Sequence, residues 1–307
     1  MTSQPSSGPS GSPGDRPVVA AVPATYAIEG GGFGVYRPFP TQALPLLDPF
    51  LLLDEMEPTH HEPGEFKGAP DHPHRGFETV TYLLAGEVEH RDSHGGHGIT
   101  GPGGVQWMTA GDGVVHSEMP SRRLQTAGGT IHGFQLWVNL PRAAKRARPR
   151  YQNVDPDQLG RVEGEGWTVR VVAGSLLGAR GPASTHTPVT VAHLSVSPGG
   201  VVELDADSEC NVGLYAFNGS GTLGAGDHGR TGLERRTMAI YEPGQGTITV
   251  AVPISASEGL ELLVLAGRPL DEPVARYGPF VMNTEAEILE AMRDYQAGRM
   301  GRIPAQT

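Results

Sequence analysis

Apolar and polar residues alternate along short stretches of the chain, with a period of two residues. In residues 130–140 (TIHGFQLWVNL), Phe134 and Leu136 share one parity, whereas Gln135 and Trp137 share the other. Since successive side chains of a β-strand point to opposite faces, this segment is predicted to be a half-buried strand. Trp137 and Gln135 could line a pocket or serve packing alone, and the pattern does not decide between these roles.

Similar short apolar stretches recur through the second half of the chain. They include WTVRVVAG from Trp167, NVGLYAFNG from Asn211, TITVAV from Thr247 and LELLVLAG from Leu260. Short strands divided by turns, without a long helical period, indicate a sandwich or barrel. The 44 glycines and 27 prolines agree with many turns and few helices. The sequence therefore predicts an all-β fold.

One helix is expected, near the C-terminus. Thr284 and Glu287 have the spacing of a capping box, in which the two side chains satisfy free backbone donors at the start of a helix. Ile288, Leu289, Met292 and Tyr295 follow at helical spacing. We expect this helix to pack against a barrel.

The charge balance limits the kinds of partner. The formal net charge is −11, which argues against broad binding to nucleic acids or to membrane surfaces. The single cysteine, Cys210, excludes an internal disulfide framework. We find neither a secretory signal nor an apolar run long enough to span a bilayer. A cytoplasmic location is expected.

Two polar pairs bracket the stretch from Asp71 to Pro120. His72 and His74 form the first pair, and His116 and Glu118 form the second. Residues two apart on a strand share a face, and the glycine-rich turns between the pairs would bring the strands together. Three imidazoles and one carboxylate suit a divalent first-row transition metal. The alternative is that these are ordinary histidines at strand ends.

Other polar residues lie near these pairs in the sequence. Carried forward from His74, the strand parity places Glu78 on the metal-facing side, as a second acid. His90, His94 and His97 surround a Gly-Gly turn, and we expect them in an exposed hairpin loop.

At these residues the chain resembles the pirins, a branch of the cupin superfamily. The segments that carry the resemblance are HPHRGFETVTYLL, QWMTAGDGVVHSEMP, HGFQLWVNLP and GPFVMNTEAEI. The resemblance implies a bicupin, that is, two tandem cupin-type β-barrels. It also implies iron or another divalent metal in the first barrel, held by the ligands His72, His74, His116 and Glu118. The broader cupin pattern would instead place the carboxylate ligand at Glu78.

On this basis the chain divides into four segments. Residues 1–17 are a Ser/Pro/Gly tract that is expected to be a disordered tail. Residues 18–140 would form the N-terminal metal-binding cupin domain, and residues 141–150 a basic interdomain linker. A nucleic-acid patch is the weaker interpretation of that linker, because the chain as a whole is acidic. Residues 151–307 would form a metal-free C-terminal cupin domain with the terminal helix, since they contain neither ligand pair.

Pirin-like cupins are associated with quercetin 2,3-dioxygenase activity, which opens a flavonol with O2 and releases carbon monoxide. The resemblance implies a small aromatic substrate, with Glu118 or Glu78 removing the proton of its hydroxyl group. Fe(2+) is the expected metal, although manganese, nickel, cobalt and zinc accept the same ligands. Two other classes stay open: a metal- or redox-sensing protein that binds a transcription-related protein partner, and a Lewis-acid isomerase or epimerase.

Overall fold

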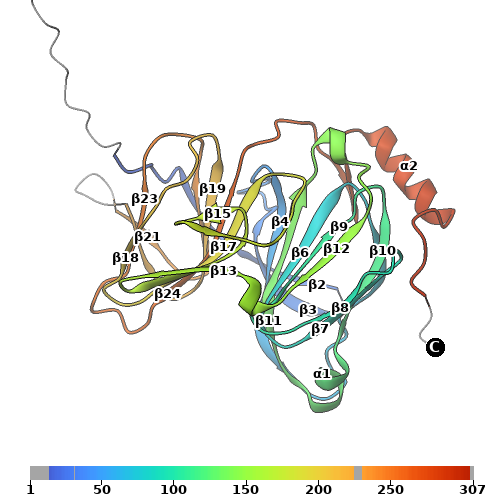
Figure 1. Ribbon diagram of the computed structural model, residues 1–307, viewed down its shortest axis with the longest axis horizontal. Coiled ribbons are helices and arrows are strands. Elements are labelled where there is room, and N and C mark those ends of the chain that lie inside the picture. The colour runs from blue at the N-terminus through green and yellow to red at the C-terminus, as the bar shows by residue number, and fades with distance from the viewer. Residues whose placement is uncertain (1–13, 31, 225–229, 305–307) are drawn as a thin grey trace, which may run out of the picture.

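The computed structural model describes residues 14–30, 32–224 and 230–304, which form two β-barrels next to each other (Figure 1). Each barrel combines a seven-stranded with a four-stranded antiparallel sheet. The predicted all-β class with two tandem barrels is therefore confirmed. In the described part of the chain, no helix is long and apolar enough to cross a bilayer.

Both sheets of the first barrel are built mainly from the N-terminal half of the chain. The order in the seven-stranded sheet is β12 (Arg150–Val154), β9 (Val105–Thr109), β6 (Phe77–Ala85), β11 (Gly129–Asn139), β4 (Phe50–His61), β3 (Phe33–Phe39) and β2 (Thr25–Glu29). The order in the four-stranded sheet is β5 (Ala69–His74), β10 (Val114–Pro120), β7 (Val88–Asp92) and β8 (His97–Thr100).

The second barrel repeats this arrangement. Its seven-stranded sheet has the order β1 (Ala20–Pro23), β22 (Thr237–Tyr241), β19 (Asn211–Asn218), β24 (Leu260–Gly267), β17 (Val189–Val196), β14 (Trp167–Ala173) and β13 (Gly160–Gly164). Its four-stranded sheet has the order β18 (Val201–Leu204), β23 (Ile248–Ala251), β20 (Gly221–Leu223) and β21 (Thr231–Leu233).

The remaining elements are short pairs of strands and helices. The strand pairs are β15 (Ser175–Leu176) with β16 (Ala179–Arg180), and β25 (Ala275–Tyr277) with β26 (Phe280–Met282). The helices are α1 (Arg122–Ala127), α2 (Glu285–Gln296) and the 3-10 turns η1 (Arg142–Ala144) and η2 (Pro156–Gln158). Helix α1 is not among the elements predicted from the sequence.

The expected C-terminal helix is confirmed as α2. Thr284 Oγ1 accepts a hydrogen bond from the Glu287 backbone N–H (3.3 Å) and donates one to the Glu287 carboxylate (2.8 Å). This pairing satisfies donors at the first turn, where a helix has no internal acceptors. Ile288 and Ala291 are buried, but Leu289, which the apolar spacing assigned to the packed stripe, is 52% exposed.

The alternation of side chains along the strands creates three separate interiors. Phe134 and Leu136 of β11 lie between the two seven-stranded sheets, where they join one apolar cluster with Tyr215 and Leu263 of the second barrel. The interior of the second barrel is filled by another apolar cluster, which includes Leu194 and draws residues from both of its sheets. By contrast, the interior of the first barrel contains polar side chains and a cavity.

Two edge strands pair with the barrel opposite to the one predicted from the domain boundaries. Strand β1 pairs with β22 of the second barrel, although residues 18–140 were assigned to the first domain. Strand β12 pairs with β9 of the first barrel, although residues from 151 onward were assigned to the second domain. Helix α2 also contacts the first barrel, because Asp294 accepts a hydrogen bond from Arg75 (2.8 Å). Each barrel is therefore completed by segments from the other half of the chain.

The prediction of a disordered tail at residues 1–17 is wrong for its last four residues. Residues 1–13 lie outside the described residues, but residues 14–17 are ordered against the second barrel. Arg16 is only 3% exposed, and its Nε donates to the Glu242 carbonyl (2.9 Å). Asp15 forms a β-bridge with Thr247. The composition of the tract did not reveal that its last residues cover the barrel.

The basic segment 141–150 is not a free linker, because Lys145 is buried in the first barrel. Its Nζ donates to Asn139 Oδ1 (2.6 Å) and to the carbonyls of Gly76 (2.8 Å) and Val281 (3.0 Å). Burial lowers the pKa of Lys145 to about 7, although Glu272 and Glu287 oppose this shift. The lysine thus ties the segment to the turn before β6 and to strand β26.

We expect Lys145→Met to lower the free energy of unfolding by ~2–4 kcal/mol, because three buried oxygens lose their donor. The pKa of Lys145 is about 7 in the folded protein and about 10 in the unfolded chain, so between these pH values the unfolded state binds the extra proton. The stability of the wild-type protein relative to the variant should therefore rise with pH from about 7 to about 10. Urea unfolding at several pH values measures both effects.

Lys67→Met is the matched control, since Lys67 is exposed and Lys145 is the only other lysine of the chain. It should change neither the stability nor its pH dependence. A difference between wild type and Lys145→Met that stays constant with pH would contradict the lowered pKa.

Candidate metal centre

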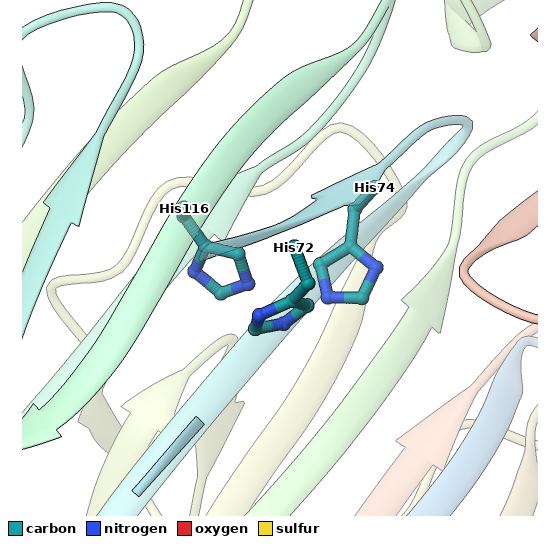
Figure 2. Close-up of side chains that lie close together, drawn as sticks. All are labelled: His72, His74 and His116. Carbon is teal, nitrogen blue, oxygen red and sulfur yellow. The ribbon is translucent and has the colours of Figure 1, made fainter. Parts of the chain in front are cut away.

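The three predicted histidines converge inside the first barrel, as Figure 2 shows. His72 and His74 lie on β5, and His116 lies on the adjacent strand β10, directly opposite His72. One ring nitrogen from each lies within 4.8 Å of the others. The two-residue spacing of the first pair and the antiparallel pairing of the strands together produce this cluster.

The outer ring nitrogens of these histidines are held by the protein. His72 Nδ1 lies 2.7 Å from the Pro70 carbonyl oxygen, and His74 Nδ1 lies 3.2 Å from that of Pro279. A carbonyl oxygen only accepts hydrogen bonds, so each Nδ1 is the donor and each Nε2 is the ring nitrogen left for another partner. His116 Nε2 is buried and has no hydrogen-bond partner among the described residues.

These features fit a divalent transition-metal ion. The three imidazoles converge on one point, and one buried ring nitrogen has no partner among the described residues. Such an arrangement can supply part of the coordination shell of an ion and leave other positions open. Burial lowers the pKa of both His74 and His116 well below the usual range, and neighbouring histidines lower it further. Both rings are therefore neutral at neutral pH, as metal ligation requires.

Glu118 lines the same cavity as His72 and His74, and other side chains hold its carboxylate. Its Oε1 accepts hydrogen bonds from Thr81 Oγ1 (2.6 Å) and from Gln106 Nε2. The pairing of β10 with β5 shifts register between His116 and Glu118, which redirects the carboxylate. The group close enough to share an ion consists of the three histidines without Glu118, although Glu118 lines the same cavity.

The structure does not bring Glu78 to the cluster, and the parity argument was wrong. Glu78 is fully buried outside the cavity lining, where it accepts hydrogen bonds from Trp107 Nε1 (3.1 Å) and Thr109 Oγ1 (2.7 Å). Burial raises its pKa, against the effect of these two bonds. Gly76, with a φ of 88°, separates β5 from β6, so the faces of one strand do not continue into the next. Thr81 points into the cavity instead.

A cavity of about 540 Å³ opens next to the histidines. Its apolar walls include Phe33, Phe66 and Trp137, and both Trp137 and Gln135 line it. The indole ring of Trp137 stands edge-on to His74 at 5.3 Å between ring centres. Of the two roles left open for Trp137 and Gln135, lining a pocket is the one that the structure supports.

The C-terminal segment completes the cavity, which the sequence analysis missed. Arg276 lies over the Trp137 ring, with 4.8 Å between the guanidinium carbon and the ring centre. Gly278 and Pro279 line the same cavity. The signal was present in the sequence, since these residues stand at the start of the GPFVMN segment that carried the family resemblance.

His90 was also misplaced by the sequence analysis. His94 and His97 are exposed in the hairpin, as expected, but His90 is only 1% exposed. Its Nδ1 lies 3.4 Å from His116 Nδ1, and its Nε2 lies 3.1 Å from Asp92 Oδ2. His90 thus lies behind the cluster of three histidines, in contact with His116.

Comparisons with known proteins identify the family of the chain. Residues 32–138 match the pirin family model, and residues 191–301 match the model of the pirin C-terminal cupin domain. A pirin-like protein of Solanum lycopersicum is 40% identical over 286 residues, covering 93% of each chain. A Pseudomonas aeruginosa protein, named provisionally as a quercetin 2,3-dioxygenase, is 40% identical over 278 residues, covering 89% of this chain and 94% of that protein.

A solved structure is similar as well. The crystal structure of a quercetin 2,3-dioxygenase from Acinetobacter baumannii superimposes with a TM-score of 0.86 at 37% identity, covering 94% of this chain and all of that one. Two family models, a relative of nearly equal length and a double barrel with clustered histidines all lead to one assignment: this chain belongs to the pirin family.

Proposed function

We propose that the protein is a metal-dependent dioxygenase that opens a flavonol-like substrate with O2. The observation that carries the proposal is the cluster of three imidazoles, two of which, His72 and His74, line an aromatic-walled cavity. A structural metal site would leave no open coordination position, whereas His72 and His74 face an open cavity in which a substrate could reach the ion. The names of similar proteins support the same chemistry.

We assign the ligands as the Nε2 atoms of His72, His74 and His116, with Glu118 as the fourth. Its Oε1 already accepts two hydrogen bonds, so Oε2 is the oxygen that faces the ion. The ion that these ligands suit best in an oxygenase is Fe(2+), and manganese, nickel, cobalt or zinc could replace it. When bound, it would act as a Lewis acid toward the substrate oxygen and hold the reactants together.

The remaining steps are assigned to residues of the chain. Phe33, Phe66 and Trp137 provide an apolar wall against which an aromatic ring can pack, and this wall excludes water from it. Glu118 accepts the proton of the substrate hydroxyl group, because it lines the same cavity as His72 and His74 and lies on the same strand as His116. Thr81 and Gln106 hold that carboxylate in position through their hydrogen bonds.

To test this proposal, the protein is loaded with Fe(2+) and mixed with quercetin under anaerobic conditions, and air is then admitted. We expect one molecule of O2 to be consumed and one of carbon monoxide to be released for each quercetin that is lost. An oxygen electrode and gas chromatography measure the two gases. Conversion of the substrate without oxygen uptake would support an isomerase, and no conversion by the metal-loaded protein would contradict an enzymatic role toward flavonols.

A further inference from the structure

Behind His116 lies a chain of two polar side chains that the proposed chemistry does not use. His90 and Asp92 are both on β7, which pairs with β10, and Asp92 lies directly opposite His116. His90 is 1% exposed and Asp92 is 4% exposed. Tyr151 stacks on the His90 ring at 4.2 Å with an angle of 8° between the planes, so the orientation of this ring is fixed by packing.

Hydrogen bonds orient the carboxylate of Asp92. Its Oδ1 accepts from the backbone N–H groups of His94 (2.7 Å) and Gly96 (2.8 Å). Its Oδ2 lies 3.1 Å from His90 Nε2. Since an ionised carboxylate only accepts hydrogen bonds, a His90 ring with a single proton carries it on Nε2. His90 Nδ1 then presents a lone pair toward His116.

The same argument continues to the metal-facing ring. One proton must lie between His90 Nδ1 and His116 Nδ1, which are 3.4 Å apart. Because His90 Nδ1 has none, His116 Nδ1 carries it, and His116 Nε2 is left with its lone pair inside the histidine cluster. His72 and His74 reach the same state through single backbone carbonyls. His116 depends on two side chains for it.

We propose that His90 and Asp92 are positioning residues that fix the tautomer of His116 and so prepare it to bind the metal. This inference rests on the metal site of the proposed function. It adds that the affinity of the site for its ion depends on a carboxylate that never touches the ion. Loss of such outer partners typically weakens metal binding about 10- to 100-fold.

Asp92→Asn is the decisive variant, because asparagine has nearly the same shape as aspartate and the proposal predicts how the proton positions change. The two backbone N–H groups retain the amide oxygen at the Oδ1 position, which turns the amide NH2 toward His90 Nε2. His90 must then carry its proton on Nδ1, and His116 must carry its own on Nε2, where it blocks the metal. The substitution is therefore expected to reverse both tautomers without removing a hydrogen bond.

The test combines ¹⁵N NMR of histidine-labelled, metal-free protein with zinc titration against a competing chelator. In the wild-type protein we expect the proton on His90 Nε2 and on His116 Nδ1. In Asp92→Asn we expect both positions to be exchanged and zinc to bind about 10- to 100-fold more weakly. Glu89→Gln is the matched control on the same strand. Its carboxylate pairs with the exposed His97 (2.9 Å), so zinc affinity should not change.

Wild-type protein with the proton on His90 Nδ1 would overturn the proposal, and this measurement needs no variant. Equal zinc affinity in Asp92→Asn and wild type would also overturn it, while leaving the metal site intact. If wild-type protein binds no zinc, the metal site itself is wrong and the positioning role falls with it. These three results are distinct, and none depends on dioxygenase activity.

Discussion

Replacing His74 with alanine should give a folded protein that retains no metal at micromolar concentrations and does not open a flavonol. His74 is 4% exposed, and its Nδ1 is already committed to the Pro279 carbonyl, so its only role toward the cavity is to present Nε2. On the proposed assignment, losing one of the three imidazoles removes a direct ligand. The loss of affinity should therefore exceed the roughly 10- to 100-fold expected for an outer partner.

Elemental analysis after dialysis and oxygen uptake with quercetin check this result. His60→Ala is the matched control, because the His60 side chain is 66% exposed and lies outside the cavity lining. It should retain both the metal and the turnover. If His74→Ala bound one equivalent of metal as tightly as wild type, the three-histidine site would be wrong.

The second large effect is expected for Glu118→Gln. The amide oxygen of glutamine can still accept from Thr81 and Gln106, so the position of the side chain should be preserved. The variant loses the charge that would face the ion and the ability to take a proton. We expect turnover to fall by about 10²- to 10⁴-fold, which is the usual contribution of a general base. The metal should also bind more weakly.

Glu78→Gln separates the two acids that the sequence could not distinguish. Glu78 is buried on the same seven-stranded sheet as Thr81, and its hydrogen bonds go to Trp107 and Thr109. Its replacement should leave metal content and the turnover number unchanged, as measured by elemental analysis and steady-state oxygen uptake. Equal losses in both variants would mean that Glu118 has no special role.

The features of the fold and of the site that could be predicted from the sequence are those determined by a few neighbouring residues. The spacing of His72 and His74 determines a shared strand face, and the spacing of Thr284 and Glu287 determines a helix start. Both expectations needed only local geometry. The pairing of β10 with β5 required an additional guess, that the turns between them would close, and the structure confirms it.

The errors arose where distant segments or a local break decide the structure. The parity from His74 failed because Gly76 ends one strand before another sheet begins. The burial of His90 depends on Tyr151, which arrives on β12 from beyond the predicted linker. The burial of Arg16 depends on the carbonyl of Glu242. None of these contacts leaves a periodic signal in the residues near it.

The Pro279 carbonyl that orients His74 is 205 positions away along the chain. Arg75, the neighbour of His74, likewise donates a hydrogen bond to Asp294, a residue near the C-terminus. During synthesis, the ribosome delivers all three histidines long before it delivers either partner. The nascent first barrel therefore exists for a time with the His74 ring unanchored, and the histidine cluster is completed only when the end of the polypeptide folds back over it.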